Sequence, residues 1–322
     1  MTSGNRMNSG DRMTNSAPTN AADWIAVDWG TSRMRAWAMS DSGDILARSH
    51  SEQGMNSLAP EQFETTLLQQ ISGWLATGCK TPVIACGMVG SRQGWVEATY
   101  QALPCPPAGL MTIAPVTSPQ INVHLCPGIK QLSPADVMRG EETQVAGLLA
   151  TEPDFDGVIC LPGTHSKWVR VKKGQIFQFQ TFMTGELFAL LAEQSVLRHS
   201  MPGSGWDSSG WDSSAFAQGL AEAIEQPATV SAKLFSLRAE SLLDGLKPEV
   251  ARARLSGFLI GLELSATRSY WSGQAVAIIG AGTLAAHYAQ ALATQGTEAN
   301  IYDGESMTLK GLTAAYRHLT GV

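Results

Sequence analysis

Short hydrophobic runs separated by turn residues begin at Asp23. The runs are WIAVDWG, RMRAWAM and DILARS, and SDSGD forms the turn before the third. This pattern predicts three antiparallel strands joined by tight turns. Residues 60–76 then place apolar side chains at helical spacing, which predicts a helix with one buried face. Those side chains are Phe63, Leu67, Leu68, Ile71, Trp74 and Leu75.

The chain up to residue 150 continues with buried and irregular segments in turn. PVIACGM predicts a buried strand, and the glycine-bounded segment GSRQGW after it predicts a loop. The Pro-rich stretch 103–119 predicts irregular surface chain, and VHLCPG predicts a further short strand. Residues 141–150 predict a helix whose first turn is acidic, as the positive end of a helix dipole favours.

The second half of the chain opens with VICLPGTHSKWVRVKKGQIFQFQTFMT, which predicts a strand, a glycine turn and two more strands. A helix (GELFALLAEQSVL) follows, and we expect a loop over 201–219, where WDSS occurs twice. Residues 252–271 predict a long apolar helix, on which Gly257 and Gly261 allow another element to pack closely. AVAIIG predicts a third buried strand, followed by a helix through Leu292 and a last helix over 308–319.

Two segments far apart in the chain share one order of residues. WGTSRMRAW and PGTHSKWVRV each place Gly-Thr at the end of an apolar strand, then a hydroxyl residue, then a basic residue that opens the next strand. Gly30 and Gly163 are the matching glycines. Because an internal repeat indicates duplicated structural units, we expect two similar α/β domains that each open with the same three strands.

Composition narrows the class of protein. The chain has 322 residues, of which 44% are hydrophobic and 16% charged, as in a folded protein of about two domains. A formal net charge of −6 argues against a broad nucleic-acid surface, and no stretch reaches the ~18 apolar residues of a membrane span. Five cysteines without C-x-x-C favour a reducing, cytoplasmic setting. Residues 1–22, rich in Ser, Asn and Thr, predict a disordered tail.

Three predicted strands end in glycine turns that carry hydroxyl residues. They are Asp28-Trp29-Gly30-Thr31-Ser32, Gly163-Thr164-His165-Ser166-Lys167 and Gly280-Ala281-Gly282-Thr283. A glycine lets the backbone approach a ligand, and the neighbouring N–H groups can then point at phosphate oxygens. One such sequence is commonly a plain turn, but three of them, two in duplicated units, predict a site for a nucleoside triphosphate.

The third turn also fits a competing interpretation. Gly280-x-Gly282-x-x-Ala285 after a strand matches the dinucleotide fingerprint, and Asp303 follows where an acid would bind a ribose. These residues would suit an NAD(P)-dependent oxidoreductase. The chain reaches residue 322 soon after Asp303, which leaves too little room for the remaining strand–helix units of that fold. We therefore favour phosphotransfer, in which the same glycines pass under an adenosine.

Acids beside these turns are candidates for metal binding and proton transfer. Asp28 could bind Mg²⁺ directly or through water, or it could cap the following turn. Glu141 or Glu142, at a helix start, could accept the proton of a sugar hydroxyl that attacks the γ-phosphate of ATP. Asp136 is a third candidate for this base, and the residues alone leave the choice open.

The basic side chains suggest how phosphate and substrate are held. In the second turn His165 could position phosphate or act as a base, and Lys167 could neutralise the transferring charge or be a solvated lysine. Ser91, Arg92, Gln93 and Trp95, in a glycine-rich loop, are expected to bind a small anionic substrate together with Arg139 and Glu142. Arg92 could pair a carboxylate through two parallel hydrogen bonds, although a surface ion pair is the alternative for each arginine.

Taken together, these segments resemble the superfamily of sugar kinases, actin and heat-shock chaperone ATPases and, within it, the 2-dehydro-3-deoxygalactonokinase family. The resemblance runs from residue 25 to 316 and rests on the following segments: IAVDWGTSRMRAW, ACGMVGSRQGW, DVMRGEETQVAGLL, LPGTHSKWV, RLSGFLIGLEL, IIGAGTLAAHYAQAL and LKGLTAAY. LPGTHSKW together with GMVGSRQGW is specific to the family, whereas DWGTS marks only the superfamily.

The resemblance implies two ribonuclease-H-like (actin-like ATPase) domains with a nucleotide-binding cleft between them. Residues 23–150 and 151–307 would form the domains, with the helix at 308–322 packing back toward the first. The turns at Asp28–Ser32 and Gly163–Lys167 would bind phosphate, and Gly280–Leu284 would contact adenosine.

The activity that the resemblance implies is phosphorylation of 2-dehydro-3-deoxy-D-galactonate at its terminal (C6) hydroxyl by ATP and Mg²⁺, in galactonate catabolism. Sugar kinases of the superfamily usually carry an aspartate as the base, where this chain has Glu141 and Glu142, and we take Glu141. We expect a small sugar acid as the partner, and no nucleic acid or membrane; a homodimer is left open. A non-enzymatic, actin-like regulator is the remaining alternative, and the chain lacks a DNA-binding segment or basic tail that would favour it.

Overall fold

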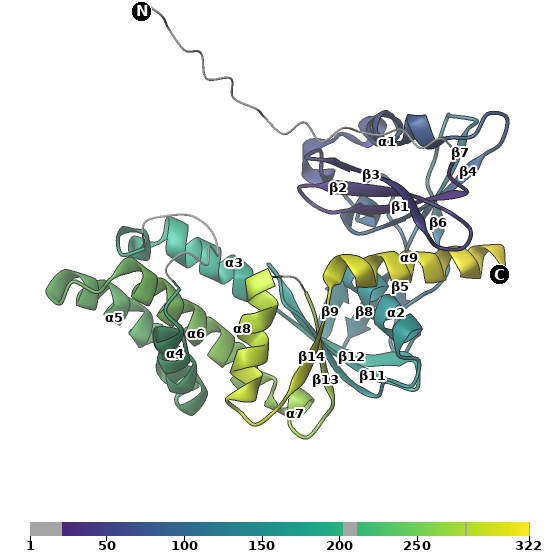
Figure 1. Ribbon diagram of the computed structural model, residues 1–322. Coiled ribbons are helices and arrows are strands. Elements are labelled where there is room, and N and C mark those ends of the chain that lie inside the picture. The colour runs from purple at the N-terminus through teal and green to yellow at the C-terminus, as the bar shows by residue number, and fades with distance from the viewer. Residues whose placement is uncertain (1–20, 202–210, 281, 322) are drawn as a thin grey trace, which may run out of the picture. The chain divides into compact units, whose positions relative to one another are not determined.

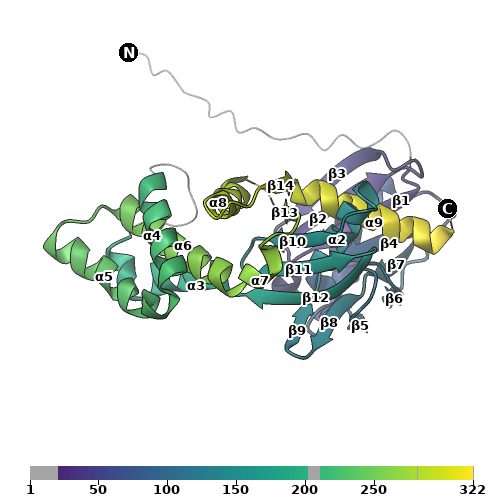
Figure 2. The same cartoon turned by 90° about the horizontal axis from the view of Figure 1, so that it is seen from below.

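The structure, a computed structural model, describes residues 21–201, 211–280 and 282–321. Its contacts divide the chain into two units, which Figures 1 and 2 show with the labels used below. Unit 1 comprises the chain up to Val96 together with Ile113–Leu125, and unit 2 comprises Glu97–Thr112 and Cys126–Val322. Residues 1–20 of the expected tail, most of the repeated WDSS segment and Ala281 lie outside the described residues.

Unit 1 is built on a sheet with the strand order β3-β2-β1-β4-β7-β6. Its strands are β1 (Trp24–Trp29), β2 (Met34–Met39), β3 (Ile45–Ser51), β4 (Thr81–Cys86), β6 (Thr112–Ile113) and β7 (Ile121–Leu125). The first three are antiparallel neighbours, as the hydrophobic runs predict, and β4 pairs parallel with both β1 and β7. The helix expected over 60–76 is shorter, because 3-10 turns flank it. These elements are η2 (Pro60–Gln62), α1 (Phe63–Ile71) and η3 (Ser72–Trp74).

Unit 2 contains a five-stranded sheet with the order β12-β11-β10-β13-β14. Its strands are β10 (Gly157–Leu161), β11 (Ser166–Lys172), β12 (Gln175–Phe182), β13 (Val276–Ile279) and β14 (Ala299–Tyr302). A smaller sheet joins β5 (Tyr100–Ala102), β8 (Gly128–Leu132) and β9 (Ala135–Met138). The hydrophobic pattern does not predict these three strands, because they are short and prolines interrupt the pattern around them.

The two larger sheets repeat one topology. β1 pairs antiparallel with β2 and parallel with β4, and β10 pairs antiparallel with β11 and parallel with β13. In both, the third strand extends the hairpin at the edge of the sheet. The internal repeat is therefore confirmed, and its two Gly-Thr turns lie at matching positions between the first and second strands.

Two long helices of unit 2, α2 (Glu141–Thr151) and α9 (Gly304–Thr320), lie side by side in both ribbon views (Figures 1 and 2). A Cβ atom at Gly147 would overlap the carbonyl oxygen of Met307, and one at Gly311 would overlap that of Thr143. The two helix backbones can approach so closely because glycine stands at both contacts. The C-terminal helix thus packs on the helix predicted over 141–150.

The units divide the chain differently from the boundary expected at residue 150. Met138, Val145 and Leu148 share a buried hydrophobic cluster with residues of β10, β11 and β13. Cys105 exchanges backbone hydrogen bonds with Ile176 of β12, at 3.0 and 2.8 Å. Burial of these side chains against the second sheet places residues 97–112 and 126–150 with the C-terminal half of the chain.

A group of helices follows β12 in unit 2. It comprises α3 (Thr184–Ala189), the π-helical turn η5 (Leu190–Gln194), η6 (Val196–His199), α4 (Ser213–Glu225), η7 (Pro227–Thr229), α5 (Val230–Leu243), α6 (Pro248–Ala266) and α7 (Arg268–Trp271). The loop expected over 201–219 is wrong after Asp212, whose side chain accepts a hydrogen bond from Ala215 N and so begins α4. α4 lies against α6 at Gly257 and Gly261, as the glycine spacing predicts.

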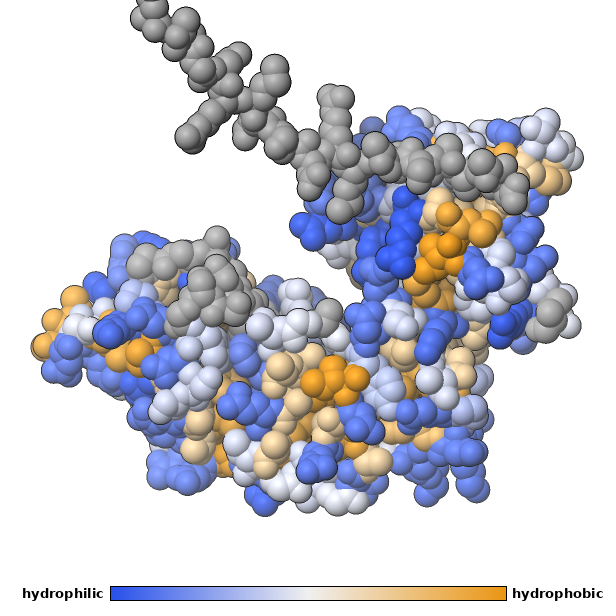
Figure 3. All heavy atoms as spheres, in the orientation of Figure 1, coloured by the Kyte–Doolittle hydropathy of each residue, from blue (hydrophilic) through white to orange (hydrophobic). Residues whose placement is uncertain are grey.

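The surface over α5 is partly hydrophobic. Phe235, Leu242 and Leu243 are exposed there, and Figure 3 shows orange spheres at the end of the helix group.

α8 (Gly282–Ala293), between β13 and β14, completes the unit. In the part of the chain that the structure describes, no helix has both the length and the apolar character to cross a membrane.

Candidate active site

The first glycine turn, Gly30–Ser32, is held by backbone hydrogen bonds. Gly30 N donates to Arg33 O at 2.9 Å, which closes the turn between β1 and β2. The carbonyl oxygens of Gly30, Thr31 and Ser32 accept hydrogen bonds from the backbone N–H groups of residues 54–56, at 3.0–3.2 Å. Thr31 and Ser32 are exposed. The segment 54–56 therefore supports the turn from behind and leaves its hydroxyl side chains free to face a ligand.

A glycine behind each turn was missed in the sequence. A Cβ atom at Gly54 would overlap the backbone of Ser32, and one at Gly185 would lie 2.9 Å from Thr164 Cα and overlap Gly163 O. Each is the third residue after the last strand of its repeat, since β3 ends at Ser51 and β12 at Phe182. Extending the comparison of the two repeats by one strand would have revealed both.

Asp28 lies at the end of β1 in an ion pair. Its Oδ2 atom is 2.5 Å from Arg35 Nη2, and its Oδ1 atom is 3.9 Å from Cys86 Sγ. Gly87 has a φ of +92°, and a Cβ atom there would lie 2.8 Å from Trp29 O and 3.3 Å from Asp28 Oδ1. The bend after β4 therefore runs directly beside this carboxylate, whose side chain is 23% exposed.

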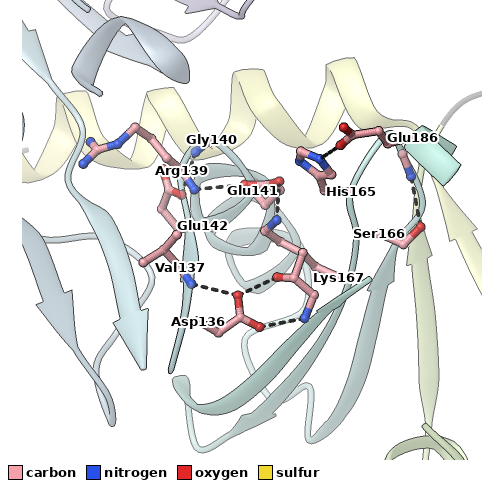
Figure 4. A network of polar contacts seen from close by, with 12 residues as sticks. Asp136, Val137, Arg139, Gly140, Glu141, Glu142, His165, Ser166, Lys167 and Glu186 are labelled. Carbon is pink, nitrogen blue, oxygen red and sulfur yellow. Dashed lines mark hydrogen bonds and ion pairs between the residues drawn. The ribbon is translucent and has the colours of Figure 1, made fainter. Parts of the chain in front are cut away.

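The second turn, Gly163–Ser166, is held by side chains as well as backbone. Gly163 N donates to Ser166 Oγ at 3.5 Å, and Glu186 N donates to Thr164 O at 3.0 Å. His165 Nε2 lies 2.5 Å from Glu186 Oε2, a contact that Figure 4 shows. Thr164 and His165 are exposed, whereas Ser166 and Lys167 are buried. α3, which contributes Glu186, thus packs against the second turn, as segment 54–56 packs against the first.

Lys167 and Glu141 form an ion pair at the start of α2 (Figure 4). Lys167 Nζ is 3.1 Å from Glu141 Oε1, and Arg139 N donates to Glu141 Oε2 at 3.0 Å. The side chain of Lys167 is 5% exposed, against 26% for Glu141. The pair brings the second turn and the helix predicted over 141–150 together.

The other two candidate bases, Glu142 and Asp136, accept hydrogen bonds from neighbouring backbone and side-chain groups. Glu142 is buried and accepts a hydrogen bond from Gly140 N at 2.7 Å; burial and the neighbouring Glu141 charge raise its pKa to about 7. Asp136 accepts hydrogen bonds from Val137 N and from both the N–H and the hydroxyl of Thr181, at 2.7–2.8 Å. It therefore ties β9 to β12, whereas Glu141 is partly exposed and pairs with Lys167.

The third glycine turn joins β13 to α8. Gly280 N donates to Tyr302 O at 3.0 Å, and Gly282 has a φ of +65°, which favours glycine. Gly282 and Thr283 are exposed. Asp303, the acid of the dinucleotide interpretation, caps α9 by accepting a hydrogen bond from Ser306 N at 2.7 Å. The place of Asp303 directly after β14 is therefore explained by its role as the N-cap of α9.

The glycine-rich loop divides its candidate residues into two groups. Arg92 and Gln93 are exposed, whereas Ser91 and Trp95 are buried. Trp95 stacks on Phe63 with ring centroids 6.0 Å apart. The Trp95 ring is therefore buried against aromatic neighbours of unit 1, Trp29 and Phe63.

Arg139 also differs from its expected place. It is 9% exposed, its guanidinium lies 4.2 Å over the Tyr100 ring, and Nη2 donates to Ala98 O at 2.8 Å. Figure 4 shows this guanidinium directed away from Glu141 and Lys167. The structure therefore does not bring the guanidinium of Arg139 together with the Glu141–Lys167 pair, although the Arg139 backbone N–H does contact Glu141.

Duplicated sheets with glycine turns at matching strand ends define an α/β protein of the actin-like ATPase fold. Solved structures with this fold include the activator of the 2-hydroxyisocaproyl-CoA dehydratase from Clostridium difficile (TM-score 0.50, 13% identity, 92% of this chain and 96% of that chain). Component A of the (R)-2-hydroxyglutaryl-CoA dehydratase from Acidaminococcus fermentans is similar as well (TM-score 0.52, 13% identity, 92% of this chain and 98% of that chain).

The chain belongs to the 2-keto-3-deoxy-galactonokinase family, whose model matches residues 28–315. It is 36% identical to the "2-dehydro-3-deoxygalactonokinase" of Escherichia coli (strain K12), over 90% of this chain and 96% of that protein. It is 39% identical to the "Probable 2-dehydro-3-deoxygalactonokinase DgoK1" of Rhizobium meliloti (strain 1021), over 93% and 98%. A crystal structure of a "putative 2-dehydro-3-deoxygalactonokinase protein" from Sinorhizobium meliloti is similar at a TM-score of 0.85 and 37% identity, covering 93% of this chain and 100% of that chain. The oxidoreductase interpretation is therefore not supported.

Proposed function

We propose that this protein transfers the γ-phosphoryl group of ATP to the C6 hydroxyl of 2-dehydro-3-deoxy-D-galactonate, which yields the 6-phosphate and ADP. The observation that carries the proposal is the Lys167–Glu141 pair, which joins a glycine turn suited to phosphate with an accessible carboxylate. Phosphoryl transfer needs both a cation near the transferring group and a base near the attacking hydroxyl. Membership of a kinase family supports the same reaction.

Two observations support the binding of ATP by the glycine turns. Glycine at 54 and 185 lets the backbone of each turn occupy the place that a Cβ atom would take, so that both turns can keep a tight conformation suited to phosphate. The residues at the tips of the turns are exposed. We assign Gly30, Thr31 and Ser32 to phosphate, Gly163 to Lys167 likewise, and Gly280, Gly282 and Thr283 to adenosine.

Mg²⁺ fits Asp28, although no cluster of three or more His, Cys, Asp or Glu side chains suited to a metal occurs among the described residues. Mg²⁺ bound with ATP keeps several waters and needs only one or two carboxylates, and Asp28 is partly exposed at the end of β1. When bound, the ion would neutralise charge on the phosphates. Arg35 would then have to share or release the carboxylate.

Glu141 is our candidate for the general base. Its Oε1 atom contacts Lys167 Nζ, so that a proton taken from the sugar hydroxyl arrives beside the cation that would contact phosphate. Arg92, exposed in its loop, would bind the substrate carboxylate at the end far from the reacting hydroxyl. Separate groups thus serve the two ends of the sugar acid.

The test is release of ADP from Mg-ATP with and without the sugar acid. We expect release to require 2-dehydro-3-deoxy-D-galactonate, with the epimeric 2-dehydro-3-deoxygluconate as the selectivity control. Slow ADP release at the same rate with and without the sugar acid would contradict the proposal and favour an actin-like regulator. Because all five cysteines are thiols in the structure, we also propose that the protein is located in the cytoplasm, where thiols stay reduced.

A further inference from the structure

A buried carboxylate lies behind the second turn and takes no part in the chemistry proposed above. Glu263, near the end of α6, is 1% exposed. Trp168 Nε1 donates to its Oε1 atom at 2.7 Å, Tyr288 OH donates to its Oε2 atom at 2.8 Å, and Thr184 Oγ1 also donates to Oε2. Three donors from β11, α8 and α3 therefore converge on one side chain of α6.

Each of the three donors is also connected to the second turn, Gly163–Lys167, by a contact or along the chain. Tyr288 OH lies 2.9 Å from Ser166 Oγ, which in turn accepts a hydrogen bond from Gly163 N. Thr184 begins α3, whose Gly185 packs on Gly163 and Thr164. Trp168 directly follows Lys167 in β11. The carboxylate thus secures the turn through its hydroxyl, its backbone and its strand.

The charge of Glu263 also sets the direction of these hydrogen bonds. An ionised carboxylate can only accept, so Tyr288 must donate to it and must receive the hydroxyl proton of Ser166. Ser166 then presents a lone pair to Gly163 N–H. Gly163 N–H thus donates to Ser166, Ser166 O–H donates to Tyr288 and Tyr288 O–H donates to Glu263, and this order of donors favours one conformation of the turn.

Stability alone gives little reason to bury a charge here, since a well-packed apolar group is often as stable as a buried ionic one. Burial raises the pKa of Glu263 to about 7, which reflects that cost. α8, which carries Tyr288, begins at Gly282 in the turn assigned to adenosine. Glu263 therefore connects two segments that are assigned to the same nucleotide.

We propose that Glu263 is a positioning residue for ATP, which holds the Gly163–Lys167 turn and the start of α8 in the conformation that binds the nucleotide. This inference rests on the proposed kinase function. It assigns a task to a side chain that does not touch ATP itself and acts through Ser166, Tyr288 and α3.

The substitution Glu263→Gln tests the direction of the hydrogen bonds with little change in shape. Trp168 N–H can only donate, so the amide oxygen must face it and the amide NH₂ must face Tyr288 and Thr184. Tyr288 would then donate to Ser166, and the hydrogen bond from Gly163 N would be weakened. At pH 8 we expect the Kd for Mg-AMPPNP, measured by calorimetry, to rise about tenfold.

Two further variants separate positioning from folding. Tyr288→Phe cuts the connection to Ser166 but leaves Trp168 and Thr184 on Glu263, and should raise the same Kd about threefold; it decides the question if Glu263→Gln does not fold. Glu240→Gln removes the ion pair with Arg254 on the same helix α6, and should leave the Kd unchanged. KM for the sugar acid should stay constant in all three.

The outcomes distinguish this inference from the function on which it rests. A higher Kd for Mg-AMPPNP in folded Glu263→Gln, with an unchanged KM for the sugar acid, supports a positioning role. Wild-type affinity in folded Glu263→Gln or Tyr288→Phe overturns it and leaves the kinase function intact. A wild-type protein that neither binds Mg-AMPPNP nor phosphorylates the sugar acid overturns both.

Discussion

The two Gly-Thr turns occupy matching places in a duplicated sheet, yet they are held in different ways. Backbone N–H groups of residues 54–56 support Gly30–Ser32. The buried side chains of Ser166, Tyr288 and Glu263 support the turn at Gly163, together with the Glu186–His165 and Lys167–Glu141 pairs. The repeat thus preserves the path of the chain and the glycine behind each turn, while the ion pairs beside the turns differ: Asp28 pairs with Arg35 near the first, and Lys167 pairs with Glu141 near the second.

The largest effect should come from the Lys167–Glu141 pair of the second turn, which contains the proposed base. Glu141→Gln removes the proposed base but keeps a side chain of the same shape beside Lys167. We expect kcat to fall by about 10²–10⁴, with little change in KM for ATP, as steady-state kinetics would show. Glu225→Gln, on an exposed position of α4, is the control. A Glu141→Gln enzyme with near-normal kcat would move the search to Glu142.

The backbone support of the first turn predicts a strong effect of a single methyl group. In Gly54→Ala the new Cβ meets the backbone of Ser32, which cannot move without displacing the turn. Such overpacking typically costs about 1–3 kcal/mol of unfolding free energy, and we expect a loss of ATP affinity with it. Urea unfolding and calorimetry with Mg-AMPPNP measure the two.

Gly73→Ala is the matched control, because a Cβ atom there has nothing within 4 Å. It should leave both quantities unchanged. Equal behaviour of the two alanine variants would show that the first turn does not depend on segment 54–56.

Arg92 tests whether the loop of unit 1 serves the substrate and not the nucleotide. A guanidinium–carboxylate contact contributes about 1.5–3 kcal/mol, and it is made equally in the ground and transition states. Arg92→Ala should therefore raise KM for the sugar acid roughly tenfold to a hundredfold and leave kcat and KM for ATP nearly constant. An unchanged KM would place the substrate carboxylate elsewhere.

A smaller effect concerns pH, through the two buried glutamates of unit 2. Burial raises the pKa values of Glu142 and Glu263 from 4.5 to about 7. Between these pH values the folded protein binds more protons than the unfolded chain, so the free energy of unfolding falls as pH rises from about 4.5 to 7 and then levels off. Glu142→Gln should remove part of this decline, on the order of 1–3 kcal/mol, in urea unfolding at pH 5 and pH 8. An equal decline in variant and wild type would contradict the assignment.

The sequence predicted those features that depend on neighbouring residues. Alternating runs and Gly-Thr turns gave the repeated hairpins, and the acids at 141 and 142 marked the start of α2. Gly54 and Gly185 could not be recognised by themselves, because the contact that requires glycine is made with a distant segment.

Glu263 carried a signal that was overlooked. It is a lone acid in the apolar helix segment SGFLIGLEL, and such a group must find partners when it is buried. Its partners, Trp168, Thr184 and Tyr288, come from three other elements, and only the fold brings them together. Trp95 illustrates a different case, because an indole in a glycine-rich loop suggests a ligand contact, and the sequence does not show that its ring stacks on Phe63.

Hydrogen–deuterium exchange with and without Mg-AMPPNP tests most directly whether both turns of the repeat bind one nucleotide. We predict slower exchange in peptides covering 30–33 and 163–167 when the nucleotide is present, and slower exchange at 91–95 only when the sugar acid is added. Protection confined to one of the two turns would contradict the account, because the duplicated turns would then not share a ligand.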